Sequence, residues 1–289
     1  MMPASRSPPY HFAGPIRGNR ISLRVSILAS GSSGNCTLLE TSQTRLLVDA
    51  GLGKKETLRR LAAVESSIDR LDGIVISHEH SDHIGGLGPL LAHWHTTVYI
   101  TAETHGETLR ILSETHAKRL DRVEFIEAGQ RFTVGDIEVS PFRIPHDAVD
   151  PLGFAFRAAG VKVAVATDLG YMTVLVKEHL RDSDAMLLES NHDLEMLKVG
   201  PYPWHVKQRV MSRTGHLSNE TVSEFLADPE GFDARSRYLV LAHLSESNNN
   251  PHVARICAEE ALNRRQGDSA FHGELLVASQ HEPLPPIQL

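Results

Sequence analysis

One stretch of the chain, from Gly73 to Gly86, joins a buried strand to a dense group of metal-ligand side chains. It reads GIVISHEHSDHIGG. Its apolar residues, Ile74 to Ile76, form a short β-branched run that stops at a polar residue, which is typical of a buried strand. Four imidazole or carboxylate side chains follow: His78, His80, Asp82 and His83. A chain with this stretch is constrained to fold around the turn that carries them.

The spacing of these residues predicts the direction of their side chains. His78 and His80 leave the strand end with alternate spacing, so both imidazoles project to the same side. Asp82 is predicted to cap the following helix, with His83 in its first turn. Imidazole and carboxylate ligands favour zinc, iron or manganese over calcium. Four ligands on one loop exceed what one tetrahedral metal with an open position takes, so we predict two adjacent metal ions.

The motif also resembles a known family signature. HEHSDH is similar to the HxHxDH motif of the metallo-β-lactamase superfamily, and the resemblance extends from about Arg24 to Asn250. It implies that His78 and His80 bind a first metal ion. Asp82 and His83 would then bind the second. The implied fold is α/β, an αββα four-layer sandwich with the metals where strand ends meet.

The same resemblance implies three further metal ligands after later strands. His146 follows the segment that ends in SPFRIP, where the family places the third ligand of the first metal. Asp168 closes the hairpin GFAFRAAGVKVAVATD and corresponds to the carboxylate that bridges both metals. His243 ends the strand YLVLAHL and is implied to complete the second metal. The predicted cofactors are two divalent transition-metal ions, with Zn²⁺ favoured over Mn²⁺ or Fe²⁺.

His216 lies in the segment GHLSN. Its pairing with a later histidine on a strand resembles ribonuclease Z and its relatives. By that resemblance His243 binds metal, while His216 lies over the substrate as a general acid or a phosphate contact. Asp82, together with Asp168, is predicted to orient the attacking hydroxide. The residues leave open which of the two histidines completes the second metal site.

Other residues near these motifs are candidate substrate contacts. Ser32 and Asn35 lie in GSSGN, a loop that either brings N–H groups to an anion or is a plain turn. His192 lies near the end of AMLLESNHD, whose polar residues, Glu189 among them, either support the metal ligands or only mark a strand end. Asp49, at the end of LLVD, is predicted to be a structural or supporting carboxylate and not a ligand.

The segment from Met196 to Asn219 contains no Asp or Glu. It interleaves cationic and aromatic residues, namely Lys198, Tyr202, Trp204, Lys207, Arg209 and Arg213. Such a pattern suits phosphate neutralisation with base stacking, and Lys207 and Arg209 are therefore candidate substrate contacts. The alternative is an amphipathic helix after a proline turn, whose charges are only solvated.

The composition is that of a globular protein with one large core. The chain has 289 residues, of which 22% are charged and 41% apolar. We predict one domain over residues 23–289, after a loose tail over residues 1–22. The sequence has no membrane-spanning run or secretion signal, and only Cys36 and Cys257, so we expect a cytoplasmic protein without a disulfide framework. Its net charge of −7 argues against coating nucleic acid by bulk electrostatics, but permits a local basic groove.

The sequence therefore predicts a binuclear metal-dependent hydrolase. The segments SGSSGN, DAGL, SHEHSDH, GHLSN and AHLSESNNNP resemble the YycJ/WalJ subgroup, which is regarded as exonuclease-like phosphodiesterases. A metal-bridging hydroxide would attack a phosphodiester in line, so the expected partner is nucleic acid or a small phosphodiester. Homo-oligomer formation is left open, and no membrane partner is expected. The alternative is a thioester or ester hydrolase of glyoxalase II type, because the same hydroxide attacks carbonyls.

Overall fold

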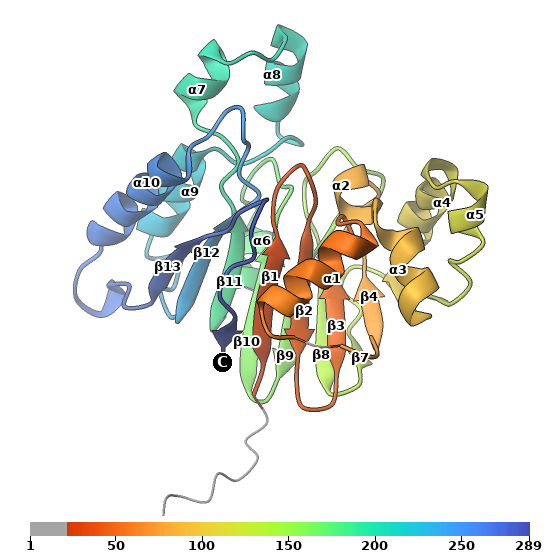
Figure 1. Cartoon of the computed structure of the whole chain (residues 1–289). Coiled ribbons are helices and arrows are strands. Elements are labelled where there is room, and N and C mark those ends of the chain that lie inside the picture. Colours follow the sequence, from red (N-terminus) through yellow and green to blue (C-terminus); the bar gives the residue numbers. More distant parts are fainter. Residues whose placement is uncertain (1–21, 67) are drawn as a thin grey trace, which may run out of the picture.

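The computed structural model describes residues 22–66 and 68–289, which fold into two sheets packed face to face between helices (Figure 1). The tail predicted over residues 1–22 lies outside this part of the chain, except for Ser22. Within the described residues, no helix combines the length and the apolar character needed to cross a bilayer. Cys36 and Cys257 are both free thiols, as expected.

The first sheet has the strand order β14-β1-β2-β3-β4-β5-β6. Its strands are β1 (Arg24–Ala29), β2 (Cys36–Glu40), β3 (Arg45–Val48), β4 (Gly73–Val75), β5 (Val98–Ile100), β6 (Val123–Phe125) and β14 (Ile287–Gln288). β1, β2 and β3 pair antiparallel, whereas β3 to β6 run parallel. The carboxyl ends of the parallel strands therefore meet at one edge of the sheet.

The second sheet has the order β13-β12-β11-β10-β9-β8-β7. Its strands are β7 (Phe132–Val134), β8 (Ile137–Arg143), β9 (Leu152–Ala158), β10 (Val161–Ala166), β11 (Ala185–Glu189), β12 (Tyr238–Ala242) and β13 (Glu274–Val277). β9 and β10 form the predicted antiparallel hairpin, and β10 to β13 run parallel. β10, β11 and β12 thus also end at a common edge.

Helices cover the outer faces of both sheets. Along the first sheet lie α1 (Lys54–Ala63), α2 (Ser81–Ile84), α3 (Leu87–Trp94), α4 (Ala102–Ile111) and α5 (Glu114–Ala117). Along the second lie α6 (Val174–Leu180), α9 (Asn219–Ala227) and α10 (Pro251–Asn263), and the 3-10 turn η1 (Gly267–Ser269) follows α10. Separate apolar clusters fill the space between the sheets and the space beneath each helical layer. This arrangement confirms the predicted αββα sandwich.

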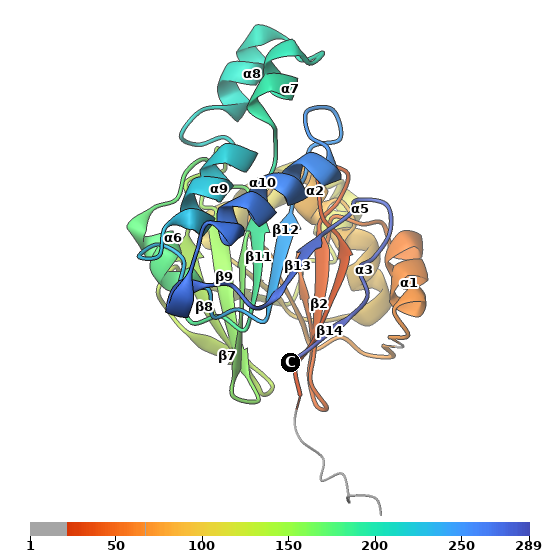
Figure 2. The same ribbon diagram turned by 90° about the vertical axis from the view of Figure 1, so that its left-hand side faces the viewer.

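Two short helices, α7 (Leu194–Val199) and α8 (Trp204–Val210), stand out from the sandwich (Figures 1 and 2). We call residues 194–210 the α7–α8 projection. Asp193 caps α7 by accepting a hydrogen bond from Met196 N at 2.8 Å. The sequence pattern predicted α8 as one of two alternatives and did not predict α7. The projection rises from the chain between β11 and α9, next to the edge where the strands end.

Candidate metal centre

The turn after β4 is held tightly against the loop after β3. Ser77 donates from N and Oγ to the two carboxylate oxygens of Asp49, at 2.8 and 2.9 Å. Asn35 N donates to Asp82 O at 2.7 Å. A Cβ on Gly51 would lie 1.8 Å from Asp82 O, so this close approach requires glycine. The segments DAGL and GSSGN thus act as a frame for the histidine motif.

The prediction that Asp82 caps a helix was wrong. His80 has the extended backbone of an N-cap residue, with φ −62° and ψ 147°, and α2 begins at Ser81. Asp82 therefore lies inside the first turn of α2. Its side chain, free of a capping role, accepts a hydrogen bond from Asn35 Nδ2 at 3.2 Å and faces the other predicted ligands.

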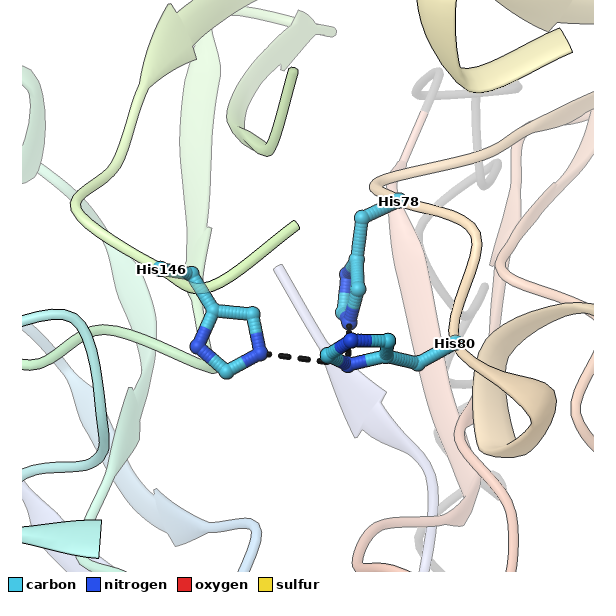
Figure 3. Close-up of side chains that lie close together, drawn as sticks. All are labelled: His78, His80 and His146. Carbon is cyan, nitrogen blue, oxygen red and sulfur yellow. Dashed lines mark hydrogen bonds between the residues drawn. The ribbon is translucent and has the colours of Figure 1, made fainter. Parts of the chain in front are cut away.

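His78, His80 and His146 form a first group, whose ligand atoms all lie within 4.8 Å of one another (Figure 3). Nδ1 of His80 lies 3.1 Å from Nε2 of His78 and 3.3 Å from Nε2 of His146. His146 Nδ1 donates to the carbonyl of Gly215 at 3.2 Å, which directs the lone pair of Nε2 toward the group. Burial lowers the pKa of His78 well below its usual value, aided by neighbouring His83, and keeps it in the neutral, ligand form.

A second group consists of Asp82, His83, Asp168 and His243, again with ligand atoms within 4.8 Å of one another. His83 Nε2 lies 3.3 Å from Asp168 Oδ2, and His243 Nε2 lies 3.4 Å from Asp168 Oδ1. Asp168 also approaches the first group, because its Oδ1 is 3.9 Å from His146 Nε2. The structure thus brings all the predicted ligands together, with Asp168 between the two groups, and its role as a bridging ligand stays a prediction.

The donor set fits divalent transition-metal ions. Asp168 Oδ2 is buried and accepts no hydrogen bond from the described residues. Burial opposes ionisation of Asp168, but His243 and His83 outweigh it and hold the carboxyl pKa well below its usual range. A buried anionic oxygen without a hydrogen bond calls for a nearby cation. Imidazole nitrogens mixed with carboxylates suit zinc, iron or manganese.

Three of the site residues have left-handed backbones. Asp49 follows β3, Asp168 follows β10 and His243 follows β12, with φ of 60°, 60° and 54°. This region is costly for residues other than glycine, although Asp and His enter it more readily than most. At each of these strand ends the backbone turns sharply, and the residue at the turn places its side chain at the metal centre. The sequence pattern identified the residues but not their conformation.

Asp49 and Glu189 hold the ligand histidines in place. Asp49 Oδ2 accepts a hydrogen bond from His83 Nδ1 at 2.8 Å, which agrees with its predicted supporting role. Glu189 Oε1 accepts from His243 Nδ1 at 3.0 Å, which leaves Nε2 of His243 for a metal. Glu189 also accepts backbone hydrogen bonds from two segments, through Asp168 N and Leu169 N after β10 and Leu217 N before α9. The sequence left open whether Glu189 supports the site, and only the folded chain brings those segments together.

His216 lies beside His243, with the two rings stacked at a centroid distance of 5.4 Å. Its Nδ1 donates to Glu189 Oε1 at 2.8 Å. Burial disfavours the charged imidazolium, but Glu189 and Asp168 outweigh this effect and raise the pKa of His216. His216 belongs only to a further group with Asp168, Glu189 and His243, whereas His243 Nε2 lies 3.4 Å from Asp82 Oδ2, so His243 is the better partner for Asp82 and His83. The assignment of His243 as ligand and His216 as acid stays a prediction.

The structure places the smaller substrate-contact candidates around this centre. Ser32 is exposed in the loop before β2, whereas Asn35 is buried, with Nδ2 3.0 Å from His83 Nε2. His192 is buried, and its Nδ1 has no hydrogen-bond partner among the described residues. Burial lowers its pKa to about 4, which keeps the imidazole neutral. Contact of these residues with a substrate stays a prediction.

The cations of the α7–α8 projection and its foot already have partners. Lys207 is buried and donates to Lys198 O at 2.7 Å, and Lys198 Nζ lies 2.6 Å from Glu195. Arg209 pairs with Asp147, and the guanidinium of Arg213 lies 4.2 Å from the ring centre of Tyr171. One interpretation of residues 196–219 expected these cations to be available for phosphates, but in the folded chain each of them already contacts another group. Glu195 and Asp147 lie outside that segment, which is why its composition did not reveal them.

Comparison with known proteins agrees with the motif. Residues 44–243 match the family described as Beta-lactamase superfamily domain. The chain is 37% identical over 243 residues to Exodeoxyribonuclease YycJ of Bacillus anthracis, covering 84% of this chain and 90% of that one. It is 38% identical over 243 residues to Exodeoxyribonuclease WalJ of Streptococcus pneumoniae, covering 82% and 87%. The solved metallo-beta-lactamase fold protein YhfI of Bacillus subtilis matches the fold with a TM-score of 0.64 and 18% identity, over 91% and 99% of the chains.

Proposed function

This chain belongs to the metallo-β-lactamase superfamily, and on that premise we propose that it is a metal-dependent exonuclease acting on DNA. One observation carries the proposal. The YycJ and WalJ proteins, both named exodeoxyribonucleases, are 37% and 38% identical to this chain, and each match covers more than four fifths of this chain and of the relative. The two adjacent ligand groups support it, because paired metal ions suit the hydrolysis of a phosphodiester.

The two side-chain groups have distinct tasks in this proposal. His78, His80 and His146 would hold one divalent ion, and the group around Asp168 would hold the other. Such ions supply an activated water at neutral pH and neutralise the oxygens of a phosphodiester. Asp168 and Asp82 would orient the nucleophile by accepting its hydrogen bonds. Asp49 and Glu189 fix the ligand tautomers, so the imidazole lone pairs are directed inward before substrate arrives.

His216 would protonate the departing oxygen. Its Nδ1 hydrogen is held by Glu189, and the carboxylates of Glu189 and Asp168 raise the pKa of the ring, which favours a second proton on Nε2. A proton passed to the leaving alkoxide would leave a neutral imidazole, which takes a new proton from solvent. Its side chain is 19% exposed, so a substrate can reach it. Removal of this group should therefore slow the chemical step and leave the metals in place.

The α7–α8 projection would guide the nucleic acid toward this centre. Trp204 is 62% exposed on α8, and an exposed indole ring offers a stacking surface for a base. At the foot of the projection, Arg213 lies over the ring of Tyr171 and presents a positive charge near the strand ends. Stacking and one or two cations give binding that tolerates many sequences, which suits an exonuclease.

An assay of several substrates in parallel tests the proposal. Metal-loaded protein is given end-labelled single- and double-stranded DNA and RNA, bis-p-nitrophenyl phosphate and a thioester. We expect DNA to be shortened progressively from an end, and Asp168→Ala to abolish the cleavage. Hydrolysis of the thioester with a higher kcat/KM, and no shortening of DNA, would contradict the proposal and support the glyoxalase II type of activity.

A further inference from the structure

Asp147 is an acidic residue at the metal centre that neither predicted group includes. It follows His146 in the loop after β8, and its Oδ1 lies 3.5 Å from His146 Nε2. This oxygen is buried and accepts no hydrogen bond from the part of the chain that the structure describes. The other oxygen, Oδ2, pairs with Nε of Arg209 on α8. Arg209 on the projection thus holds Oδ2, while Oδ1 lies beside the first group.

The loop that carries Asp147 is fixed on both sides of the residue. His146 Nδ1 donates to Gly215 O at 3.2 Å, and Val149 N donates to Oε1 of Glu79 at 2.9 Å. Glu79 is buried and lies in the sequence between two histidines of the first group. The loop and the histidine motif are therefore tied together. Turning the carboxylate of Asp147 away from His146 would disturb its ion pair with Arg209.

The charge balance of the two groups gives this carboxylate a task. The second group contains Asp82 and Asp168, whereas the first consists of three imidazoles and only shares the Asp168 carboxylate, whose Oδ1 is 3.9 Å from His146 Nε2. Neutral imidazoles compensate none of the charge of a divalent cation, and an uncompensated charge in a buried site is costly. A carboxylate a few ångströms away attracts the cation strongly where water is scarce. Asp147 is placed to provide that attraction.

We propose that the carboxylate of Asp147 stabilises the metal ion of the first group by attracting its positive charge. Arg209 is then the positioning residue that holds this carboxylate toward the site. The inference rests on the proposed function, since it takes the first group as a metal site. Oxygen ligands suit manganese better than imidazole alone does. The carboxylate should therefore matter more for Mn²⁺ than for Zn²⁺. It also joins the α7–α8 projection to the metal centre through Arg209.

Metal titration in the absence of nucleic acid tests the proposal. Competition with a chromophoric chelator gives the affinities of both sites for Zn²⁺ and Mn²⁺. Asp147→Asn keeps the shape of the side chain but removes its charge. We expect it to weaken the metal affinity of the first site by about 10- to 100-fold, with a larger loss for Mn²⁺ than for Zn²⁺, and to leave the affinity of the second site unchanged. Asp147→Glu should recover part of this loss. Arg209→Met should cause a smaller loss at the same site.

Asp150→Asn is the matched control, because it removes a carboxylate of the same loop whose partner is Arg143 at 3.3 Å. It should leave both affinities unchanged. Wild-type affinities in Asp147→Asn, or an equal loss in Asp150→Asn, would overturn the proposal. Protein that binds both metals, loses one in Asp147→Asn and yet does not cut DNA would contradict only the proposed function. The two failures are therefore distinguishable.

Discussion

Backbone strain and hydrogen-bond partners decide what individual residues do in this site. Asp168 and His243 occupy left-handed conformations, with φ of 60° and 54°, that cost roughly 1–3 kcal/mol each for an ordinary residue. The fold maintains them because Glu189 binds the backbone N–H of Asp168 and the Nδ1 of His243. These hydrogen bonds hold both ligand side chains at the ends of their strands.

The roles of His243 and His216 can be separated by replacing each with alanine. His243 Nε2 lies 3.4 Å from both Asp82 and Asp168, so His243→Ala should lower the metal content of the second site. His216→Ala should keep both metals and lower kcat by about 10²- to 10⁴-fold, because it removes the acid. Elemental analysis and steady-state kinetics measure the two effects. The opposite pattern would mean that the two residues have exchanged roles.

The motif residues could be predicted from the sequence because their chemistry and spacing are local. HEHSDH names four ligands in one stretch, and Asp168 and His243 end strands with clear apolar patterns. The role of Glu189 was left open, because its partners come from segments distant in the sequence. No sequence pattern singles out Asp147, because its significance depends on a buried oxygen and on Arg209 in another element.

At the scale of elements, short loops and one helical projection set the geometry. Most strands and longer helices could be predicted from apolar periodicity, as for β4, the β9–β10 hairpin and α10. α6 and β14 were not predicted, because α6 has about two turns and β14 is a bridge of two residues. The loop after β3 packs on α2 more closely than any pattern could indicate.

Gly51→Ala tests that close packing. The added methyl would lie 1.8 Å from Asp82 O, whereas one added at Gly53, two residues later, would meet no described atom within 4 Å. We expect Gly51→Ala to reduce the free energy of unfolding by about 1–3 kcal/mol, through overpacking. It should also weaken the second metal site, because Asp82 must move. Denaturant titration of Gly51→Ala and Gly53→Ala makes the comparison, and equal stabilities would contradict the account.

Trp204→Ala tests the stacking surface on the α7–α8 projection. Loss of a stacked base costs about 1–3 kcal/mol of binding free energy, and stacking is not ionic, so the salt dependence of binding should hardly change. Phe125→Ala is the control, because Phe125 is a similarly exposed aromatic residue, at 60%, but lies on β6 at the edge of the first sheet and not on the α7–α8 projection. Fluorescence anisotropy with single-stranded oligonucleotides measures both variants. Equal weakening by both changes would mean that α8 is not the binding surface.

At the scale of the whole molecule, the metal centre joins the two sheets. The first sheet contributes the histidine motif after β4, and the second contributes His146, Asp168 and His243 after β8, β10 and β12. The αββα architecture and its site could be predicted from sequence, because the family motif and the strand ends coincide. The outward position of α7 and α8 could not, since it depends on packing between distant segments (Figure 1).

Removal of the metals should therefore destabilise the fold. Each ion that binds only the native state adds about 2.7 kcal/mol when its free concentration is 100 times its Kd. Dialysis against a chelator should lower the thermal midpoint, and added Zn²⁺ should restore it. In Asp168→Ala the chelator should have a smaller effect. If protein shown to be free of metal had the same thermal midpoint as the metal-loaded protein, the metal ions would not stabilise the contact between the sheets.

We propose that two metal ions, bound by residues of both sheets, make this chain a DNA exonuclease. Metal-free protein titrated with Zn²⁺ or Mn²⁺ tests it directly, with bound metal and cleavage of end-labelled DNA measured on the same samples. We expect activity to follow occupancy of the second site and to reach its maximum near two ions per chain. Full exonuclease activity at one ion per chain, or no activity at two, would contradict it.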